Sequence, residues 1–309
     1  MNTKRISNRG LSSGSASGLR LTYVCNAGFL LSLPGDRWTI AIDAFSKDPA
    51  GLYTDTPLQW RERLFQMAAA GKLNLLIISH EHADHYCRED VLRAVEEGWR
   101  NGHPIGILTT GAVAEDLSGS ASRTLQGVLR QNMRVLPDEE GHCMIDLFPA
   151  GAPLPERGEG MANAGGMGEK GIPETVRIHL EAVIVRHDGK QYTSVSNMML
   201  LMHIYMGEHS LKLVFPADAS PTAQLYKRIA QWSDSVDWLI VPFPCIGKSS
   251  ARSVLKDHLK VRHIAACHFP APESDVQGWY ARTIDACKKA QDGLPEPVLL
   301  REPGSILDI

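Results

Sequence analysis

A short apolar run in this chain ends in a cluster of residue types that bind metal ions. The stretch LNLLIISHEHADHYCRED, residues 73–90, places His80, His82, Asp84 and His85 directly after the run. Neutral imidazole nitrogens and carboxylate oxygens are ligands that Zn²⁺ and similar ions accept. Residues two apart in an extended segment face the same way, so His80 and His82 could bind one ion together. The spacing predicts a metal site; a solvated polar loop is the alternative.

Strand-like and helix-like segments interleave around this cluster. The strands are expected at 21–25, 28–33, 38–43, 73–79, 105–110, 133–137, 143–148, 174–187, 197–206, 211–218, 237–243, 261–269 and near the C-terminus. Helices are expected at 57–70, with Thr56 as N-cap, at 88–100, near 122–131, from Pro221 with Ser220 as cap, at 250–260 and at 273–291. The turn at 34–37 predicts a hairpin. Interleaved elements of this kind predict a layered α/β protein.

The chain shows no internal repeat and no shift of composition that would mark a domain boundary. Residues 20–309 are therefore expected to form a single domain, preceded by a flexible tail over 1–19 that is rich in Ser and Gly. The Gly-rich segment 151–173 predicts a loop. This loop could be a lid over the site or a plain surface insertion.

Bulk composition limits the kinds of partner. The 309 residues carry a net charge of -3 with a pI near 6.5, so there is no basic footprint for nucleic acid, and a small-molecule substrate is favoured. The six cysteines have no CxxC spacing, which indicates reduced thiols. No signal peptide or membrane-spanning run is present, so we expect a cytoplasmic protein without membrane association. The oligomeric state cannot be read from the sequence.

Two motifs together resemble a known family. NAGFLLSLPGDRWTIAIDAF, residues 26–45, followed by ISHEHADHY, residues 78–86, is similar to the metallo-β-lactamase superfamily of metallohydrolases, in particular its lactonase-like and phosphodiesterase-like branch. The resemblance covers most of the chain from about residue 21. It implies a four-layer αββα sandwich with a dinuclear site at one edge, between the two sheets. The expected cofactors are two divalent ions, by default Zn²⁺, although Mn²⁺ or Fe²⁺ would accept the same ligands.

The resemblance implies three further ligands besides His80, His82, Asp84 and His85. A histidine after a long central strand points to His187, with His179 on the same strand as its rival. The bridging aspartate corresponds to Asp218, although Ala217 stands where the family has glycine and Asp218 could instead belong to a helix-capping turn. The last histidine corresponds to His268, which leaves His263 a structural or outer role.

Asp43 matches the family's early strand-end aspartate. That residue supports the site by hydrogen bonding and is not a ligand; an ordinary turn aspartate is the alternative.

The resemblance implies hydrolysis. Two divalent ions, the carboxylates Asp84 and Asp218 and a bridging hydroxide together leave one positive charge, which favours an anionic substrate or transition state. A hydroxide that bridges the ions would need no separate base, and Asp84 would orient it and pass a proton on. The expected substrates are esters, lactones or phosphodiesters.

Single residues bear on the other functions found among relatives. Oxygen-reducing diiron relatives carry Glu where this chain has His82, and β-lactamases that hydrolyse antibiotics carry Cys where it has Asp218, so both are disfavoured. An RNA- or DNA-processing nuclease stays open, because Arg252, Lys256 and Lys260 would share one helix face and could contact phosphates. A catalytically silent metal-binding module is the non-enzymatic alternative.

Three tyrosines could hydrogen-bond a developing oxyanion. They are Tyr53, Tyr86 and Tyr192, and Tyr86 is preferred because it adjoins His85. Core packing is favoured over this role for each of the three.

Overall fold

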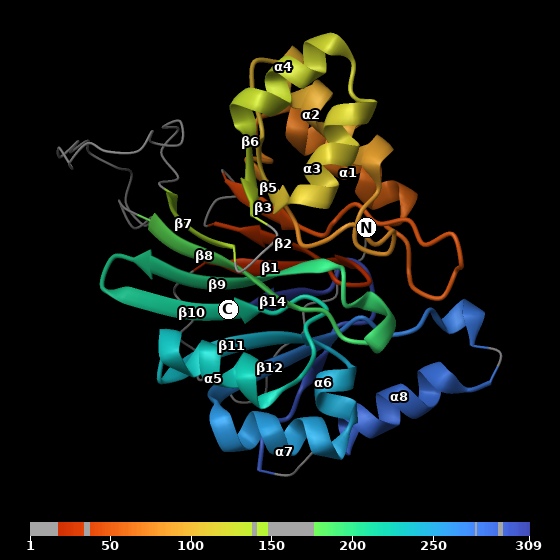
Figure 1. Cartoon of the computed structure of the whole chain (residues 1–309), viewed down its shortest axis with the longest axis vertical. Coiled ribbons are helices and arrows are strands. Elements are labelled where there is room, and N and C mark those ends of the chain that lie inside the picture. Colours follow the sequence, from red (N-terminus) through yellow and green to blue (C-terminus); the bar gives the residue numbers. More distant parts are fainter. Residues whose placement is uncertain (1–17, 34–37, 138–140, 148–175, 276, 290–292) are drawn as a thin grey trace.

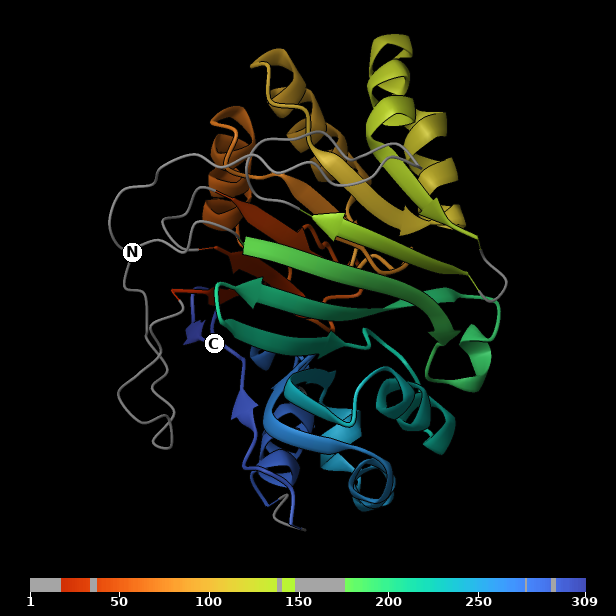
Figure 2. The ribbon, with the colours of Figure 1, turned by 90° about the vertical axis from the view of Figure 1, so that its left-hand side faces the viewer.

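Two stacked β-sheets form the centre of the molecule, and helices cover their outer faces. This computed structural model describes residues 18–33, 38–137, 141–147, 176–275, 277–289 and 293–309. Each sheet has seven strands, in the orders β14-β1-β2-β3-β4-β5-β6 and β13-β12-β11-β10-β9-β8-β7. Figure 1 shows one group of helices above the strands and a second group below them, and Figure 2 shows the same layers from the side.

The first sheet comes mainly from the N-terminal half of the chain. Its strands are β1 (Arg20–Cys25), β2 (Gly28–Ser32), β3 (Thr39–Ile42), β4 (Leu75–Ile78), β5 (Gly106–Thr110), β6 (Met133–Leu136) and β14 (Ile306–Asp308). Strands β3 to β6 run parallel. The helices on its outer face are α1 (Leu58–Ala69), α2 (Arg88–Arg100), α3 (Gly111–Ser120) and α4 (Arg123–Asn132).

The second sheet comes from the C-terminal half. Its strands are β7 (His142–Leu147), β8 (Val176–Arg186), β9 (Ser196–Met206), β10 (His209–Phe215), β11 (Ser235–Pro242), β12 (Lys260–Cys267) and β13 (Val298–Leu299). Its helices are α5 (Ala223–Trp232), α6 (Pro244–Gly247), α7 (Ser249–His258) and α8 (Trp279–Lys288), with short 3₁₀ turns η2 (Lys190–Tyr192) and η3 (Pro272–Ser274).

Three separate hydrophobic cores hold these layers together, and strand β4 shows how the sequence produces them. Leu75 and Ile77 point into the core between the two sheets, whereas Leu76 and Ile78 point into the core beneath α1–α4. A third core lies between the second sheet and its helices. Because both faces of β4 are buried, its sequence is continuously apolar. The predicted four-layer αββα sandwich is confirmed.

Several helix boundaries differ from the sequence prediction. Helix α2 spans Arg88–Arg100 as predicted, and Ser122 caps α4 by accepting a hydrogen bond from the Leu125 N–H. Thr56 is not the N-cap of α1: its hydroxyl donates to the Ala44 carbonyl and accepts from the Ser46 N–H. The cap of α5 is likewise not Ser220 but Thr222.

Two further helical regions differ from the sequence prediction. Helix α3, with glycine as its first residue, lies where no helix was expected. The single helix expected over 273–291 is divided into η3 and α8, because Gly278 adopts a left-handed conformation with φ of +66° between them.

Some predictions fall outside the described residues. The loop at 151–173, the hairpin turn at 34–37 and nearly all of the N-terminal tail belong to this part. The hairpin strands β2 and β3 do pair antiparallel. Leu19, the last residue of the expected tail, is fully buried. No helix in the described part of the chain is both long and apolar enough to span a membrane.

Strands of both sheets end at one edge of the sandwich. Strands β3 and β4 are parallel neighbours in the first sheet, and β10, β11 and β12 are parallel neighbours in the second. Strand β8 runs in the direction of β10, because both pair antiparallel with β9. The residues that follow β3, β4, β8, β10 and β12 therefore emerge together, which is where α/β proteins place their ligands.

Replacing Phe215 by alanine is expected to lower the free energy of unfolding by about 3–5 kcal/mol. Its ring is fully buried between the sheets and meets the Phe29 ring edge-on, with 5.6 Å between ring centroids. Urea denaturation monitored by circular dichroism would measure the change. Met144→Ala serves as the control, because Met144 is 59% exposed. Equal losses in both variants would contradict the packing described above.

Candidate metal centre

The edge where the strands end brings seven potential metal ligands together in two adjacent groups. His80, His82 and His187 form the first group, and in it the ligand atoms lie within 4.8 Å of one another. The second group consists of Asp84, His85, Asp218 and His268, whose ligand atoms also lie within 4.8 Å of one another. All seven are the residues predicted from the sequence as ligands.

In the first group, hydrogen bonds fix the His80 and His187 rings so that one nitrogen of each faces its neighbours. The His80 Nδ1 lies 2.9 Å from the Ser79 hydroxyl, which leaves Nε2 3.1 Å from the His82 Nδ1. The His187 Nδ1–H donates to the Asp188 carbonyl at 2.6 Å. The His187 Nε2 is buried and has no hydrogen-bond partner among the described residues. An imidazole held through one nitrogen, with the other left open, has the arrangement of a metal ligand.

Asp218 belongs to the second group and also lies close to the first. Its Oδ2 is 3.7 Å from the His187 Nε2 of the first group and 3.2 Å from the His268 Nε2 of the second. Its Oδ1 is buried without a hydrogen-bond partner in the described part of the chain. The turn that carries Asp218 is joined to the end of β8, since the Asp188 N–H donates to the Asp218 carbonyl at 2.7 Å. This position suits a carboxylate that bridges two cations.

In the second group, Asp43 holds His85. The Asp43 Oδ1 accepts the Ser79 N–H at 2.8 Å, and its Oδ2 accepts both the Ser79 hydroxyl at 2.6 Å and the His85 Nδ1–H at 2.9 Å. The His85 Nε2 is thereby turned toward His268, whose Nε2 lies 3.1 Å away. Asp43 thus occupies the supporting position expected of it, outside both ligand groups.

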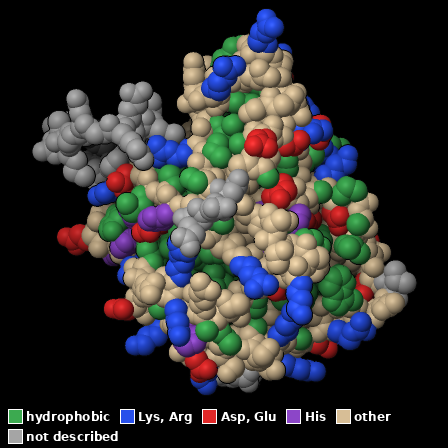
Figure 3. All heavy atoms as spheres, in the orientation of Figure 1, with side chains coloured by type: hydrophobic (Ala, Val, Ile, Leu, Met, Phe, Trp, Pro, Cys, Tyr) green, Lys and Arg blue, Asp and Glu red, His purple; other side chains and the backbone are tan. Residues whose placement is uncertain are grey.

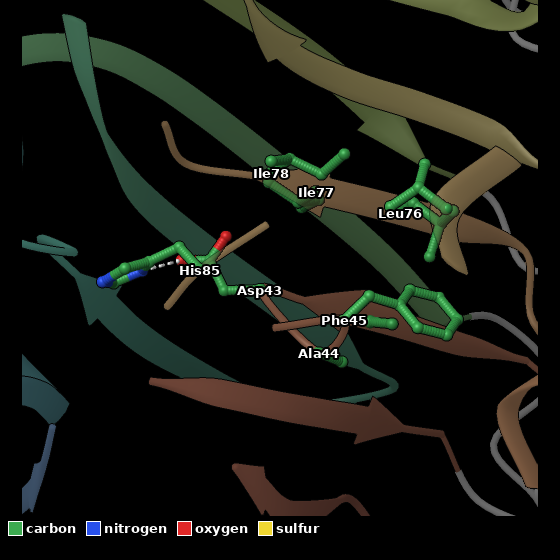
Figure 4. Close-up of a pocket in the computed structure, with 9 residues that line it drawn as sticks. Asp43, Ala44, Phe45, Leu76, Ile77, Ile78 and His85 are labelled. Carbon is green, nitrogen blue, oxygen red and sulfur yellow. Dashed lines mark hydrogen bonds and ion pairs between the residues drawn. The ribbon is translucent and has the colours of Figure 1, made fainter. Parts of the chain in front are cut away.

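A small cavity lies behind this contact, and its lining is almost entirely apolar. Figure 4 shows the hydrogen bond between Asp43 and His85 at its border. The apolar lining residues are Ala41, Ala44, Phe45, Leu76, Ile77, Ile78 and Val91. An apolar surround strengthens the electrostatic attraction between the carboxylate and the imidazole.

Asn26 is a site residue that the sequence analysis did not single out. Its side chain is fully buried, and its Nδ2 donates to the Asp84 carboxylate at 3.0 Å and to the Asp84 carbonyl at 2.9 Å. The backbone carbonyl of Asn26 accepts the His268 N–H at 3.0 Å. Asn26 therefore connects two members of the second group. The available signal was its position as the first residue of the 26–45 motif, between two expected strands; in the structure it forms a tight turn with φ of +21°.

The electrostatics of the cluster favour cations. Burial alone would raise the pKa of Asp218, but the His268 and His85 imidazoles outweigh burial and lower the pKa well below its usual value. Burial likewise works to raise the pKa of Asp84, which the same two imidazoles lower. Burial and the neighbouring His85 lower the pKa of His80. The carboxylates are therefore anionic and His80 is neutral, as metal ligands must be.

In the absence of an ion, two histidines balance these carboxylates. Burial works to lower the pKa of His268, but Asp218 and Asp84 raise it to about 10. The pKa of His85 is raised well above its usual value against the same effect of burial, by Asp218 first and Asp84 second.

Ala217 adopts the backbone conformation that explains the glycine of the related motif. Its φ is +47°, in the left-handed region that glycine enters without cost and other residues enter rarely. The turn after β10 keeps its shape and still presents Asp218.

Other residues considered in the sequence analysis lie away from the two groups. His179 is mid-strand in β8, where its Nδ1 contacts the Asp146 carboxylate at 3.1 Å. The preference for Tyr86 was wrong, because its hydroxyl donates to Asp116 at 2.9 Å. His263 stacks on the Trp238 ring, with 4.7 Å between ring centroids.

The expected basic helix face is also not formed as predicted. Helix α7 ends at His258, so Lys260 lies on β12 and does not continue the row. Arg252 donates to the Ile246 carbonyl at 2.8 Å, and Arg262 pairs with Asp237 at 2.9 Å. In Figure 3, Lys and Arg side chains cover parts of the lower half of the face shown, with Asp, Glu and His side chains among them.

Comparison with known proteins supports the fold. No family model matches the sequence, and neither does any curated protein sequence. The structure is similar to that of unliganded yeast PDE1, with a TM-score of 0.50 and 9% identity, over 94% of this chain and 99% of that one. A second similar structure is the Rm3 metallo-β-lactamase, with a TM-score of 0.33 and 14% identity, over 88% of this chain and 94% of that one.

Two sheets packed face to face, with helices outside both, define an αββα sandwich. The chain has the fold of the metallo-β-lactamase superfamily.

Replacing Asp43 by asparagine is expected to lower metal affinity by about 10- to 100-fold, as the loss of an outer partner does elsewhere. Asparagine keeps an oxygen for the Ser79 N–H, but its amide nitrogen accepts neither the Ser79 hydroxyl nor the His85 Nδ1–H, so the His85 ring is no longer fixed. Zn²⁺ titration against a competing chelator would measure the effect.

Asp146→Asn is the matched control, because Asp146 also contacts a histidine, His179, but lies outside the two groups. If the Asp43→Asn variant and the wild-type protein bound zinc equally well, the Asp43 contact would be dispensable for metal binding.

Proposed function

We propose that this protein is a hydrolase that uses two divalent metal ions, with Zn²⁺ as the default, to cleave an ester, lactone or phosphodiester bond. The observation that carries this proposal is the meeting of seven nitrogen and oxygen ligands in two adjacent groups, with Asp218 between them. The substrate would be a small molecule with an anionic group; the negative charge follows from the charge of such a centre, since two divalent ions exceed the charge of two carboxylates.

The residues present fit a pair of metal ions. The His187 Nε2 and the Asp218 Oδ1 are buried polar atoms that lack partners in the described part of the chain, and such atoms cost free energy unless something binds them. His80, His82 and His187 would hold one ion, Asp84, His85 and His268 the other, and Asp218 would contact both. Bound ions of this kind would lower the pKa of water and polarise a carbonyl or phosphoryl oxygen.

The protein's own groups have separate tasks in such a reaction. The Asp84 Oδ2 is occupied by Asn26 at 3.0 Å and by the His268 Nε2 at 3.1 Å. Its Oδ1 accepts no hydrogen bond from the described residues and is free to accept one from the attacking water. Asp84 would orient that water and receive its proton, and Asn26 would keep the carboxylate from rotating.

Loss and return of metal is the direct test of this function. The metal-free protein should hydrolyse none of a panel of p-nitrophenyl esters, lactones and bis-p-nitrophenyl phosphate, and activity toward at least one of them should return with Zn²⁺ or Mn²⁺. Metal analysis of the active protein should find two ions per chain. Two bound ions with no turnover of any substrate would favour a metal-binding module instead.

His82→Ala should abolish whatever hydrolysis the panel reveals and leave the protein folded. Loss of an outer partner alone costs about 10- to 100-fold, so loss of a ligand should reduce kcat/KM by about 100-fold or more. His209→Ala is the control, because His209 is exposed on β10 away from both groups. Full turnover in the His82 variant, with an unchanged melting temperature, would refute the role assigned to His82.

A further inference from the structure

Tyr192 lies against the first ligand group. Its ring meets those of His82 and His187 edge-on, with centroid distances of 4.7 and 4.9 Å. It ends the short turn η2, and the Tyr192 N–H donates to the Gly189 carbonyl. Gly189 has φ of +90°, and a Cβ there would lie 3.0 Å from the Tyr192 ring, so this turn requires glycine. The Tyr192 ring is thereby held over the histidines.

Tyr53 lies against the second ligand group. Its ring meets the His268 ring edge-on, with centroids 4.3 Å apart. The loop that carries it is well fixed, because the Asp48 Oδ2 accepts both the Leu52 N–H at 2.7 Å and the Tyr53 N–H at 3.0 Å. Tyr53 also forms a β-bridge with Pro270, close to His268 itself. The two tyrosines thus occupy the two ends of the metal centre.

The hydroxyl groups of these two tyrosines are available to a ligand. Neither donates a hydrogen bond to any described residue, in contrast to the Tyr86 hydroxyl, which is bound to Asp116.

An aromatic row continues from Tyr53 toward the surface. The Trp279 ring centroid lies 6.5 Å from that of Tyr53 and 6.1 Å from that of Phe243, and both pairs are edge-on. Trp279 is 39% exposed although it is a large apolar side chain. Because Trp279 is the first residue of α8, directly after the left-handed Gly278, the backbone fixes where its ring emerges.

We propose that Tyr53 and Tyr192 bind the substrate by donating hydrogen bonds from their phenols to its charged group, and that Trp279 stacks on a planar aromatic group of the same substrate. This rests on the proposed function and narrows its substrate class to anionic esters that carry an aromatic ring beside the bond to be cleaved. Phenol donors suit a phosphoryl or carboxyl oxygen, and an exposed indole suits a planar apolar surface.

Binding of two phosphonates to the zinc-loaded full-length protein tests this proposal without requiring turnover. Phenylphosphonate and methylphosphonate share the charged group and differ in the ring, and isothermal titration calorimetry measures both affinities. The wild-type protein should bind phenylphosphonate more tightly. Tyr53→Phe and Tyr192→Phe should weaken binding of both probes about tenfold, because each loses a hydrogen bond to a charged group.

Trp279→Ala and the bulkier Trp279→Leu should weaken binding of phenylphosphonate about three- to tenfold and leave methylphosphonate unchanged. Tyr86→Phe is the control and should bind both probes like the wild-type protein. Metal content is measured in every variant, since a tyrosine variant that loses zinc would show a role in the metal centre and would overturn the binding role.

The outcomes separate this inference from the proposed function. Wild-type-like affinities in the Tyr53, Tyr192 and Trp279 variants, or no binding of either phosphonate to the zinc-loaded wild-type protein, would overturn the inference even if the protein is an active hydrolase. The expected pattern of affinities in a protein that hydrolyses nothing would support the binding roles and refute the hydrolase.

Discussion

The meeting of seven potential metal ligands at one edge of the sandwich, four of them buried and three partly buried, is the constraint on which the rest of the structure depends. Polar atoms such as the His187 Nε2 and the Asp218 Oδ1 are unfavourable in a buried position without a partner. Hydrogen bonds from residues outside the two groups hold two of these side chains: Asp43 holds His85, and Asn26 holds Asp84. These supporting residues follow strand ends in the first sheet, and the three cores fix those strands. The arrangement of the site is thus a consequence of the packing.

The backbone around the site carries strain that supports the same conclusion. Among the described residues, all the non-glycine residues with positive φ belong to this edge: Asn26, Asp43, Ala217 and His268. Each left-handed residue of this kind costs about 1–3 kcal/mol, and such residues persist only where their surroundings determine them. Three of them contribute side chains to the centre, and the fourth precedes Asp218. The strands end in sharp turns here because the polar side chains must turn back toward one another.

The sequence predicted the structure best where a single physical rule determines the local structure. The continuous apolar run of β4 indicated a strand buried on both faces, and the histidine spacing after it indicated a cluster. The choice of His187 over His179 needed the family resemblance, since both lie on or next to β8. The contact of Asn26 with Asp84, and the positions of Tyr53 and Tyr192 beside the ligand groups, could not be predicted, because they depend on contacts between segments far apart in the chain. Thr56 failed as a predicted cap because a tertiary partner, Ala44, took its hydroxyl.

The ligands come from both sheets: His80, His82, Asp84 and His85 follow β4 of the first, whereas His187, Asp218 and His268 follow strands of the second. Neither half of the polypeptide contains a complete set for the two ions, and the unfolded chain contains no preformed set. An ion bound there would link the two sheets, and its binding free energy would add to the stability of the folded protein. Without bound ions, the protein would therefore be less stable at this edge than in its three hydrophobic cores.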